Sequence, residues 1–260
     1  MNNPFSLEGK TILVTGASSG IGRGIAIACA GMGAQVILTG RNQVRLQETV
    51  RMINDSHGHS DSNHGNNSQP SPLIICADLT SASDRATLVQ QLPVLDGLVQ
   101  CAGVGDRVPC KALGQEDIDR VLRPNLEAPM LLQAELLQSK KINKSASIVY
   151  IASAAATMPA VGNAVYSASK GAIISYAKCL AAELAPRGIR VNCISPTMVM
   201  TDLALVGASQ EQLDEAQKAY PLGRYGKPED IANLAVYLLS DAAAWMTGSN
   251  IEITGGSQTL

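Results

Sequence analysis

A glycine-rich turn between a strand and a helix is the feature that most restricts the fold of this chain. Residues 10–14 (KTILV) form a β-branched run of strand length, and TGASSGIG at 15–22 follows directly. Apolar residues then recur at helical spacing from residue 21 to 32. In this order, backbone N–H groups at the helix N-terminus can hold a pyrophosphate, and glycine lets the phosphates approach closely. The spacing is GxxxGxG instead of the common GxGxxG, and its context predicts a dinucleotide-binding α/β domain.

The rest of the chain alternates between strand-like and helix-like stretches. Apolar runs of strand length occupy 35–39, 73–77, 96–100, 147–152, 189–195 and 250–254. Helical patterns separate them at 43–54, 81–91, 116–140, 171–184 and 228–240. Only 3% of the residues are aromatic, so Ala, Val, Ile and Leu must build the core, which suits a parallel sheet covered by helices. We therefore expect one doubly wound (Rossmann) α/β domain over residues 1–260.

Two regions depart from this alternation. Residues 55–71 are rich in Ser, Asn, Gly and His, which predicts a mobile surface loop, and all three histidines (57, 59 and 64) lie there. A transition-metal site is conceivable in that loop, but an exposed polar loop is the favoured interpretation, and we predict no metal site. Residues 196–222 carry a weak helical pattern beyond the end of a strand, where a substrate lid would lie.

Charge and hydropathy argue against several classes of protein. The net charge is −2 without a basic block, so nothing indicates nucleic-acid binding. No apolar run is long enough to span a membrane, and residues 1–10 are polar, so we expect neither membrane insertion nor a signal peptide. The six cysteines lack CxxC spacing and are interpreted as reduced core thiols of a cytoplasmic protein.

Tyr166 and Lys170 form the candidate catalytic pair. Residues four apart share one face of a helix, so the phenol and the ammonium can point the same way. A cation about 4 Å from a phenolate stabilises it by about 4 kcal/mol at an effective dielectric of about 20, although desolvation opposes this. Such a tyrosine can exchange a proton with a carbonyl or hydroxyl oxygen. The alternative is a chance pair on a solvated helix. Ser153 follows the predicted strand 147–152 and can face the same ligand.

The residues after two other strands bear on the choice of cofactor. The tip of strand 35–39 would meet the adenosine ribose, and it carries Arg41 and no acid. Arginine pairs with phosphate through a bidentate fork, so we predict NADP(H) over NAD(H). The alternative is an ordinary exposed charge beside an NAD site. Asp78 could accept from the adenine amino group, or it could be an acid near the N-terminus of helix 81–91.

Pro129 lies inside the predicted helix 116–140 and has no N–H group, so the carbonyl of Asn125 loses its usual partner. A freed carbonyl in a buried helix must find a water or a side chain. Asn125 is therefore either part of a structural kink or one station of a proton relay.

Taken together, these motifs resemble those of the classical short-chain dehydrogenase/reductase family. The matching segments, between about residues 7 and 257, are TGASSGIG at 15–22, DL at 78–79, CAG at 101–103, Asn125, Ser153, YSASK at 166–170, RVNCISP at 190–196, GKPEDIA at 226–232 and TGG at 254–256. The resemblance implies a seven-stranded parallel sheet with helices on both faces. It also implies a catalytic tetrad in which Tyr166 is the acid/base, Ser153 hydrogen-bonds the reacting oxygen, Lys170 assists the tyrosine and binds the nicotinamide ribose, and Asn125 holds a water.

The same resemblance implies which residues hold the cofactor. They are Gly16, Ser18, Ser19, Gly20, Ile21, Gly22, Arg41, Asp78, Leu79, Cys101, Ala102, Gly103, Tyr166, Lys170, Pro196 and Thr201. Two positions depart from the family pattern. Cys101 replaces an asparagine, and Thr197 replaces the glycine that usually follows Pro196.

The reaction implied is hydride transfer between a nicotinamide and a small-molecule carbonyl or secondary alcohol. The expected substrate type is a 3-oxoacyl thioester, as in 3-oxoacyl-acyl-carrier-protein reductases. A sugar, polyol or small ketone is the close alternative, because residues 179–183 (CLAAE) lack the arginine that would dock an acidic carrier. A non-catalytic dinucleotide sensor is the alternative from another class. The family resemblance also implies a homotetramer or homodimer.

Overall fold

The computed structural model describes residues 3–57, 71–201 and 209–257. Seven strands form one sheet in the order β3-β2-β1-β4-β5-β6-β7, and all neighbouring strands are parallel. The strands are β1 (Thr11–Thr15), β2 (Gln35–Gly40), β3 (Leu73–Cys76), β4 (Leu95–Gln100), β5 (Ile142–Ile151), β6 (Arg190–Pro196) and β7 (Asn250–Ile253). The predicted seven-stranded, doubly wound fold is confirmed.

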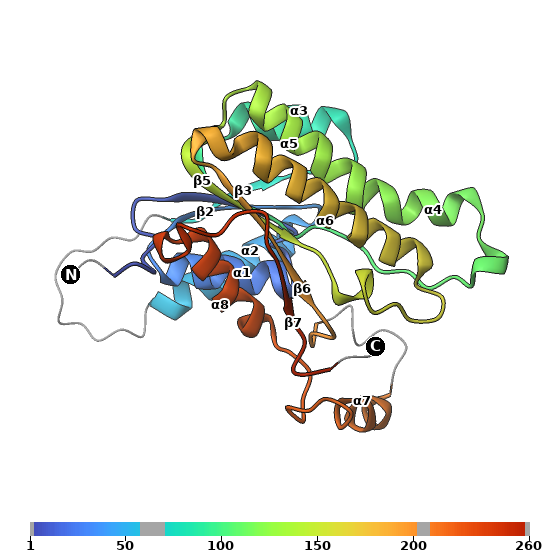
Figure 1. Cartoon of the computed structure of the whole chain (residues 1–260). Helices are drawn as coiled ribbons and strands as arrows, with labels where there is room; N and C mark the ends of the chain where they lie inside the picture. Colours follow the sequence, from blue (N-terminus) through green and yellow to red (C-terminus); the bar gives the residue numbers. More distant parts are fainter. Residues whose placement is uncertain (1–2, 58–70, 202–208, 258–260) are drawn as a thin grey trace.

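Helices cover both faces of the sheet (Figure 1). One face carries α3 (Ala82–Gln91), α4 (Gln115–Leu122), α5 (Ala128–Gln138) and α6 (Ala164–Leu184), and the other carries α1 (Gly20–Gly31), α2 (Gln43–His57) and α8 (Pro228–Leu239). The helix α7 (Gln210–Gln217) lies apart from these layers, near the C-terminal ends of β6 and β7.

The core follows from the alternation of side chains along each strand. In β1, Leu13 packs into the apolar cluster under α3, α5 and α6, whereas Ile12 and Val14 pack into the cluster under α1 and α8. Successive strand residues point to opposite faces, so a run of apolar residues fills both clusters at once. For this reason the strands appear in the sequence as continuous apolar runs without polar alternation.

The order of the strands places the ligand crevice. The chain moves outward from β1 to β3 and then returns to β4, on the other side of β1. Helices that follow β1 and β4 therefore leave the sheet in opposite directions, which opens a crevice at the carboxyl ends of these two strands.

Close packing of α1 against α8 fixes one side of that crevice. A Cβ atom on Gly24 would lie 2.8 Å from the Cβ of Pro228, so only glycine allows this approach. Pro228 is the first residue of α8, where the absence of an N–H group costs nothing.

The structure refines two predicted helices. Helix 116–140 is confirmed as one unbroken helical run over 115–138, but its middle, Arg123–Glu127, is a π-helical turn that joins α4 and α5. Helix 171–184 begins earlier, at Ala164, so Tyr166 lies within α6. The predicted loop 55–71 lies largely outside the described residues, as do residues 202–208 of the predicted lid.

The interpretation of the cysteines as core thiols was wrong for half of them. Cys29 and Cys193 are buried and Cys101 is partly buried, but Cys76, Cys110 and Cys179 are exposed; all six are free thiols.

Within the described residues, no group of three His, Cys, Asp or Glu side chains could hold a metal ion. None of the helices in the same part of the chain has the length and apolar character to cross a bilayer.

Candidate active site

The turn between β1 and α1 is tightly packed, and three of its residues, Gly16, Gly20 and Gly22, have no space for a side chain. Gly16 has φ +67°, and a Cβ atom there would lie 2.9 Å from the backbone of Ala102. A Cβ atom on Gly22 would lie 2.3 Å from the carbonyl oxygen of Gly16. Ser19 precedes α1 without capping it through its side chain, so the first N–H groups of the helix remain available. Free N–H groups at a helix N-terminus can bind an anion, so a diphosphate at this turn stays a prediction.

The loop after β4 is tied to the end of β1. Thr15 accepts hydrogen bonds through Oγ1 from the backbone N–H groups of Cys101 (3.0 Å) and Ala102 (3.1 Å). Cys101 packs against the apolar cluster under α1, and burial raises the pKa of its thiol to about 12. The thiol is therefore neutral at pH 7 and is not a nucleophile. This role of Thr15 in holding the loop after β4 was not predicted from the sequence, because a threonine at a strand end can have many roles.

The tip of β2 lies beside the glycine turn. A Cβ atom on Gly40 would lie 3.5 Å from Ser18 Oγ, and the exposed Arg41 follows immediately. The fold thus brings Ser18 next to Gly40, the residue before Arg41, although they are 22 positions apart in the sequence. Behind the turn, Arg23 donates through Nη2 to the carbonyl oxygen of Ser18 at 2.7 Å and pairs with Glu48 at 3.0 Å. Arg23 therefore supports the turn, a role that the sequence pattern did not indicate.

Asp78 and Leu79 have structural contacts of their own. Asp78 accepts through Oδ1 from the N–H (2.9 Å) and the hydroxyl (2.7 Å) of Thr80, which stabilises the turn leading into α3. Leu79 is buried in the core. These contacts fit the interpretation of Asp78 as an acid near a helix start, and a contact with adenine stays a prediction.

Lys170 is the buried cation of the site. Its side chain is 7% exposed, and Nζ donates to the carbonyl oxygen of Ile151, the last residue of β5, at 2.8 Å. The same Nζ lies 5.7 Å from the centroid of the Tyr166 ring and 3.7 Å from the position that a Cβ atom on Gly103 would occupy. The phenol and the ammonium thus lie together on α6, next to the loop after β4. A Cβ atom at position 103 would also lie 3.0 Å from Asn125 Oδ1, so a side chain there would crowd Asn125.

The side chain of Asn125 holds the segment of residues 103–108, which we call the strap. Asn125 accepts from the N–H of Val104 at 2.8 Å and donates to the carbonyl oxygen of Val104 at 2.9 Å. It also donates to Ser169 Oγ at 3.2 Å, and Ser169 donates to the carbonyl oxygen of Tyr166. The strap is thereby attached to α6, the helix that carries Tyr166 and Lys170. In an α-helix the carbonyl of Asn125 would pair with the nitrogen of Pro129, which carries no hydrogen.

Ser153 begins the short helix η3 (Ala154–Ala156), which packs against α6. Its hydroxyl accepts from the N–H of Ala155 at 3.1 Å, and the residue is 8% exposed. A hydroxyl oxygen that accepts one hydrogen bond can still donate its own hydrogen to a ligand.

Thr201 approaches the glycine turn from the other end of the chain. A Cβ atom on Gly20 would lie 3.0 Å from the methyl carbon of Thr201. Pro196 is the last residue of β6, so the segment between these residues starts at the sheet edge and reaches the N-terminus of α1.

All the elements that carry predicted site residues converge at the carboxyl edge of the sheet. The glycine turn follows β1, Arg41 follows β2, the strap follows β4 and Ser153 follows β5, while α6 supplies the tyrosine and lysine. The arrangement offers an anion cradle at one end and a hydroxyl–phenol–ammonium group at the other, which suits a dinucleotide between them.

Comparisons with known proteins agree with this geometry. A family model described as enoyl-(acyl carrier protein) reductase matches residues 16–258. The chain is 33% identical to a 3-oxoacyl-[acyl-carrier-protein] reductase of Rickettsia felis (97% of this chain and 98% of the relative) and 34% identical to a D-threitol dehydrogenase of Mycolicibacterium smegmatis (97% and 94%).

A solved structure is similar over nearly the whole chain. It is a putative NAD(P)-dependent gluconate 5-dehydrogenase of Beutenbergia cavernae with bound NADP, with a TM-score of 0.85, 34% identity and 98% of each chain covered. The match of one family over most of the sequence, with relatives above 30% identity at nearly full length, is decisive. The chain belongs to the short-chain dehydrogenase/reductase family and is an oxidoreductase that acts on CH–OH and C=O groups.

Proposed function

We propose that this chain reduces a 3-oxoacyl thioester with NADPH. The observation that carries the proposal is the position of Lys170. Its ammonium is buried against the end of β5, 5.7 Å from the Tyr166 ring, and faces the loop that passes the glycine turn. A cation held there can act on both a phenol and a ribose of a dinucleotide in that cradle.

In the proposed reaction the bound nicotinamide would supply the hydride. Tyr166 gives its hydroxyl proton to the carbonyl oxygen as that oxygen gains negative charge. Ser153 donates a hydrogen bond to the same oxygen, which stabilises the charge in the transition state. Lys170 favours the phenolate that remains, and the Asn125 carbonyl is a site for the water that restores the proton.

The preference for NADP(H) over NAD(H) rests on Arg41. The residue is exposed and directly follows Gly40, which lies beside Ser18, and the tip of β2 carries no acid that would select a free 2′-hydroxyl. The solved relative with bound NADP supports the choice. The remaining predicted contacts, those of the glycine turn, Asp78, Leu79, residues 101–103, Pro196 and Thr201, belong to the same proposal.

The direct test is a substrate panel with the purified enzyme and NADPH. An acetoacetyl thioester should cause loss of nicotinamide absorbance, and Tyr166→Phe should bind NADPH but fail to reduce. Equal turnover by Tyr166→Phe would remove the assigned acid. Arg41→Ala should raise the KM for NADPH more than that for NADH. Arg51→Ala, an exposed arginine on α2, is the matched control.

A sugar or polyol substrate is the second candidate. The relationship to a D-threitol dehydrogenase at 34% identity and the lack of arginine at residues 179–183 favour it. Turnover of polyols or ketoses with no turnover of the thioester would decide for this candidate. We also propose that the protein is cytoplasmic and forms a homotetramer or homodimer. Light scattering on the purified protein tests the oligomeric state.

A further inference from the structure

The strap is an extended segment whose residues alternate between inside and outside. Val104, Asp106 and Val108 are partly buried, whereas the residues between them are exposed. Side chains alternate in this way along an extended chain. The strap has no regular secondary structure of its own, so its position depends on what these three residues contact.

The first two residues of the strap lie next to two predicted catalytic residues. Asn125 binds both the N–H and the C=O of Val104 through its side chain. A Cβ atom on Gly103 would lie 3.0 Å from Asn125 Oδ1 and 3.7 Å from Lys170 Nζ. A movement of this part of the strap would therefore change the surroundings of the Lys170 ammonium.

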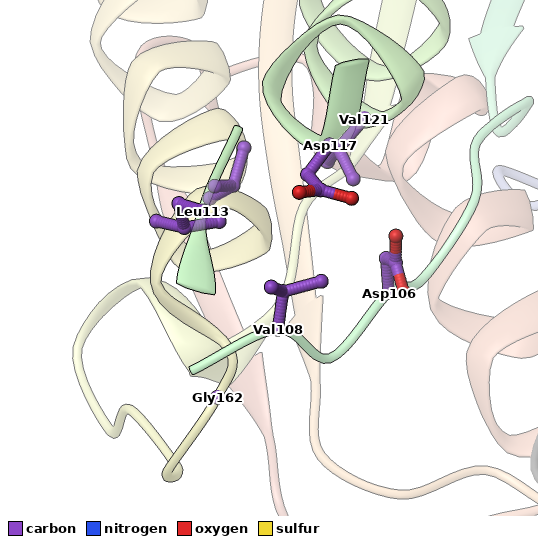
Figure 2. A pocket seen from close by; sticks show the side chains of 7 residues that line it. Asp106, Val108, Leu113, Asp117, Val121 and Gly162 are labelled. Carbon is purple, nitrogen blue, oxygen red and sulfur yellow. The ribbon is translucent and has the colours of Figure 1, made fainter. Parts of the chain in front are cut away.

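The second half of the strap faces α4 across a small pocket. Figure 2 shows Asp106 and Val108 of the strap opposite Asp117 and Val121 of α4, and all four residues line this pocket. At its far end the strap is bound again, because the N–H of Val108 donates to the carbonyl oxygen of Gly162 at 2.9 Å. Two carboxylates, one from the strap and one from α4, thus line the same pocket.

One guanidinium joins these two carboxylates. Arg120 of α4 donates through Nε to Asp106 Oδ2 at 2.8 Å and through Nη2 to Asp117 Oδ1. Asp117 is fixed in turn, because its Oδ2 accepts from the N–H of Gly114, the residue before α4, at 2.9 Å. An arginine has five N–H donors in a planar fork and can bind two carboxylates at once. Arg120 therefore ties the strap to α4.

Arg120 also offsets a repulsion. Without its charge, Asp106 and Asp117 would be two like charges on one small pocket, and like charges repel. The other oxygen of Asp106 accepts from the N–H of Arg107 at 2.8 Å, but that bond lies within the strap. Loss of the guanidinium would thus replace an attraction between the strap and α4 by a repulsion.

We propose that Arg120 is a positioning residue, which holds the strap against α4 so that its first residues stay beside Lys170 and Asn125. The inference rests on the proposed function, in which Lys170 favours the phenolate and the Asn125 carbonyl binds water. When the strap is released, water can enter beside the ammonium and screen its effect on Tyr166. Arg120 acts through the strap and not on the reacting atoms.

The first test measures turnover of the best substrate from the panel of ketones and thioesters. Arg120→Gln should lower kcat about threefold to tenfold, the size expected for two partly exposed ion pairs and the repulsion between their acids. The Kd for NADPH, measured from the fluorescence of the bound cofactor, should stay near the wild-type value, because the glycine turn and Arg41 belong to other loops. Arg120→Lys keeps the charge and should recover part of the lost kcat.

Arg123→Gln is the matched control. Arg123 lies in the same helical run and pairs with Asp119, four residues before it, at 3.2 Å. This substitution removes an exposed ion pair of the same kind without touching the acid of the strap. It should leave kcat unchanged. A loss of the same size in Arg123→Gln as in Arg120→Gln overturns the proposal, and so does a wild-type kcat in Arg120→Gln.

A double variant separates positioning from a general loss of stability. Asp106→Asn removes one of the two like charges and keeps the oxygen that accepts from the N–H of Arg107. Added to Arg120→Gln, it should restore part of the lost turnover, whereas two independent destabilising changes would add their losses. A double variant that is no faster than Arg120→Gln alone overturns the proposal.

Hydrogen exchange gives a readout that does not need turnover. The amide hydrogens of the peptide that covers the strap should exchange about threefold to tenfold faster in Arg120→Gln than in wild type, because local opening then costs less. Arg123→Gln should exchange like wild type, and equal protection in Arg120→Gln overturns the proposal. A wild-type enzyme that reduces no carbonyl contradicts the proposed function instead, and the exchange rates then still decide whether Arg120 holds the strap.

Discussion

Replacing Asp230 by Asn should lower the free energy of unfolding, because Asp230 binds the segment that precedes α8. Asp230 is the third residue of α8, and Oδ2 accepts from the N–H of Lys227 at 2.7 Å. Arg224 donates to both carboxylate oxygens, at 2.7 and 3.0 Å. These hydrogen bonds lower the pKa of Asp230 from 3.8 to about 2, chiefly through Arg224 and then through the Lys227 backbone.

The magnitude follows from this difference in pKa. A depression of about 1.8 units corresponds to about 2.4 kcal/mol in a fully shielded site. The side chains of Arg224 and Asp230 are 45% and 33% exposed, so solvent screening reduces the contribution to about 1 kcal/mol. Because the folded pKa is depressed, the stabilisation is complete above pH 3.8 and disappears as the pH falls through 2. About half should be lost at pH 3.

The assay is urea unfolding of wild type and Asp230→Asn at several pH values between 7 and 3. The free energy of unfolding should differ by about 1 kcal/mol at pH 7, and the difference should shrink towards pH 3. Glu229→Gln, an exposed acid in the same helical turn, is the control and should change little. A difference that is absent at pH 7, or that stays constant with pH, would refute the reasoning.

Three further substitutions or treatments test the site. Gly16→Ala puts an L-residue at φ +67° against the backbone of Ala102, so it should cost about 1–3 kcal/mol and weaken NADPH binding at least tenfold; unchanged binding by calorimetry would contradict the cradle. Asn125→Ala leaves the N–H and C=O of Val104 without side-chain partners, so it should cost about 2–4 kcal/mol and lower kcat; a variant with normal kcat would show that the strap needs no anchor. At pH 8 iodoacetamide should modify the exposed Cys76 and Cys110 and spare the thiols whose pKa burial raises to about 12, those of residues 29, 101 and 193, as judged by peptide mass spectrometry.

Much of the fold was predictable because the strands are short and consist almost entirely of apolar residues, many of them β-branched. In the parallel sheet every strand ends at the same edge, so residues just after a strand, such as Arg41 and Ser153, are placed at that edge by topology alone. The proximity of Tyr166 and Lys170 was predictable from local geometry, because residues four positions apart on a helix share one face.

Two features were not predicted: the true start of α6 and the attachment of the strap. The first turns of α6 carry Ser167 and Ser169, so they lack the apolar period that marks a core-facing helix, and the predicted start was too late. The anchoring of the strap depends on Asn125, whose partner Val104 lies 21 positions away. Pairing at that distance leaves no pattern in a single sequence.

The π-helical turn Arg123–Glu127 has a consequence for which changes the chain can tolerate. Val121 of α4 and Leu132 of α5 both face the core, although the turn between them departs from the α-helical period. Removing one residue there would rotate everything beyond it by about 100°. Either Asn125 or the apolar stripe of α5 would then point the wrong way. Natural variation in this segment should therefore alter its chemistry far more freely than its length.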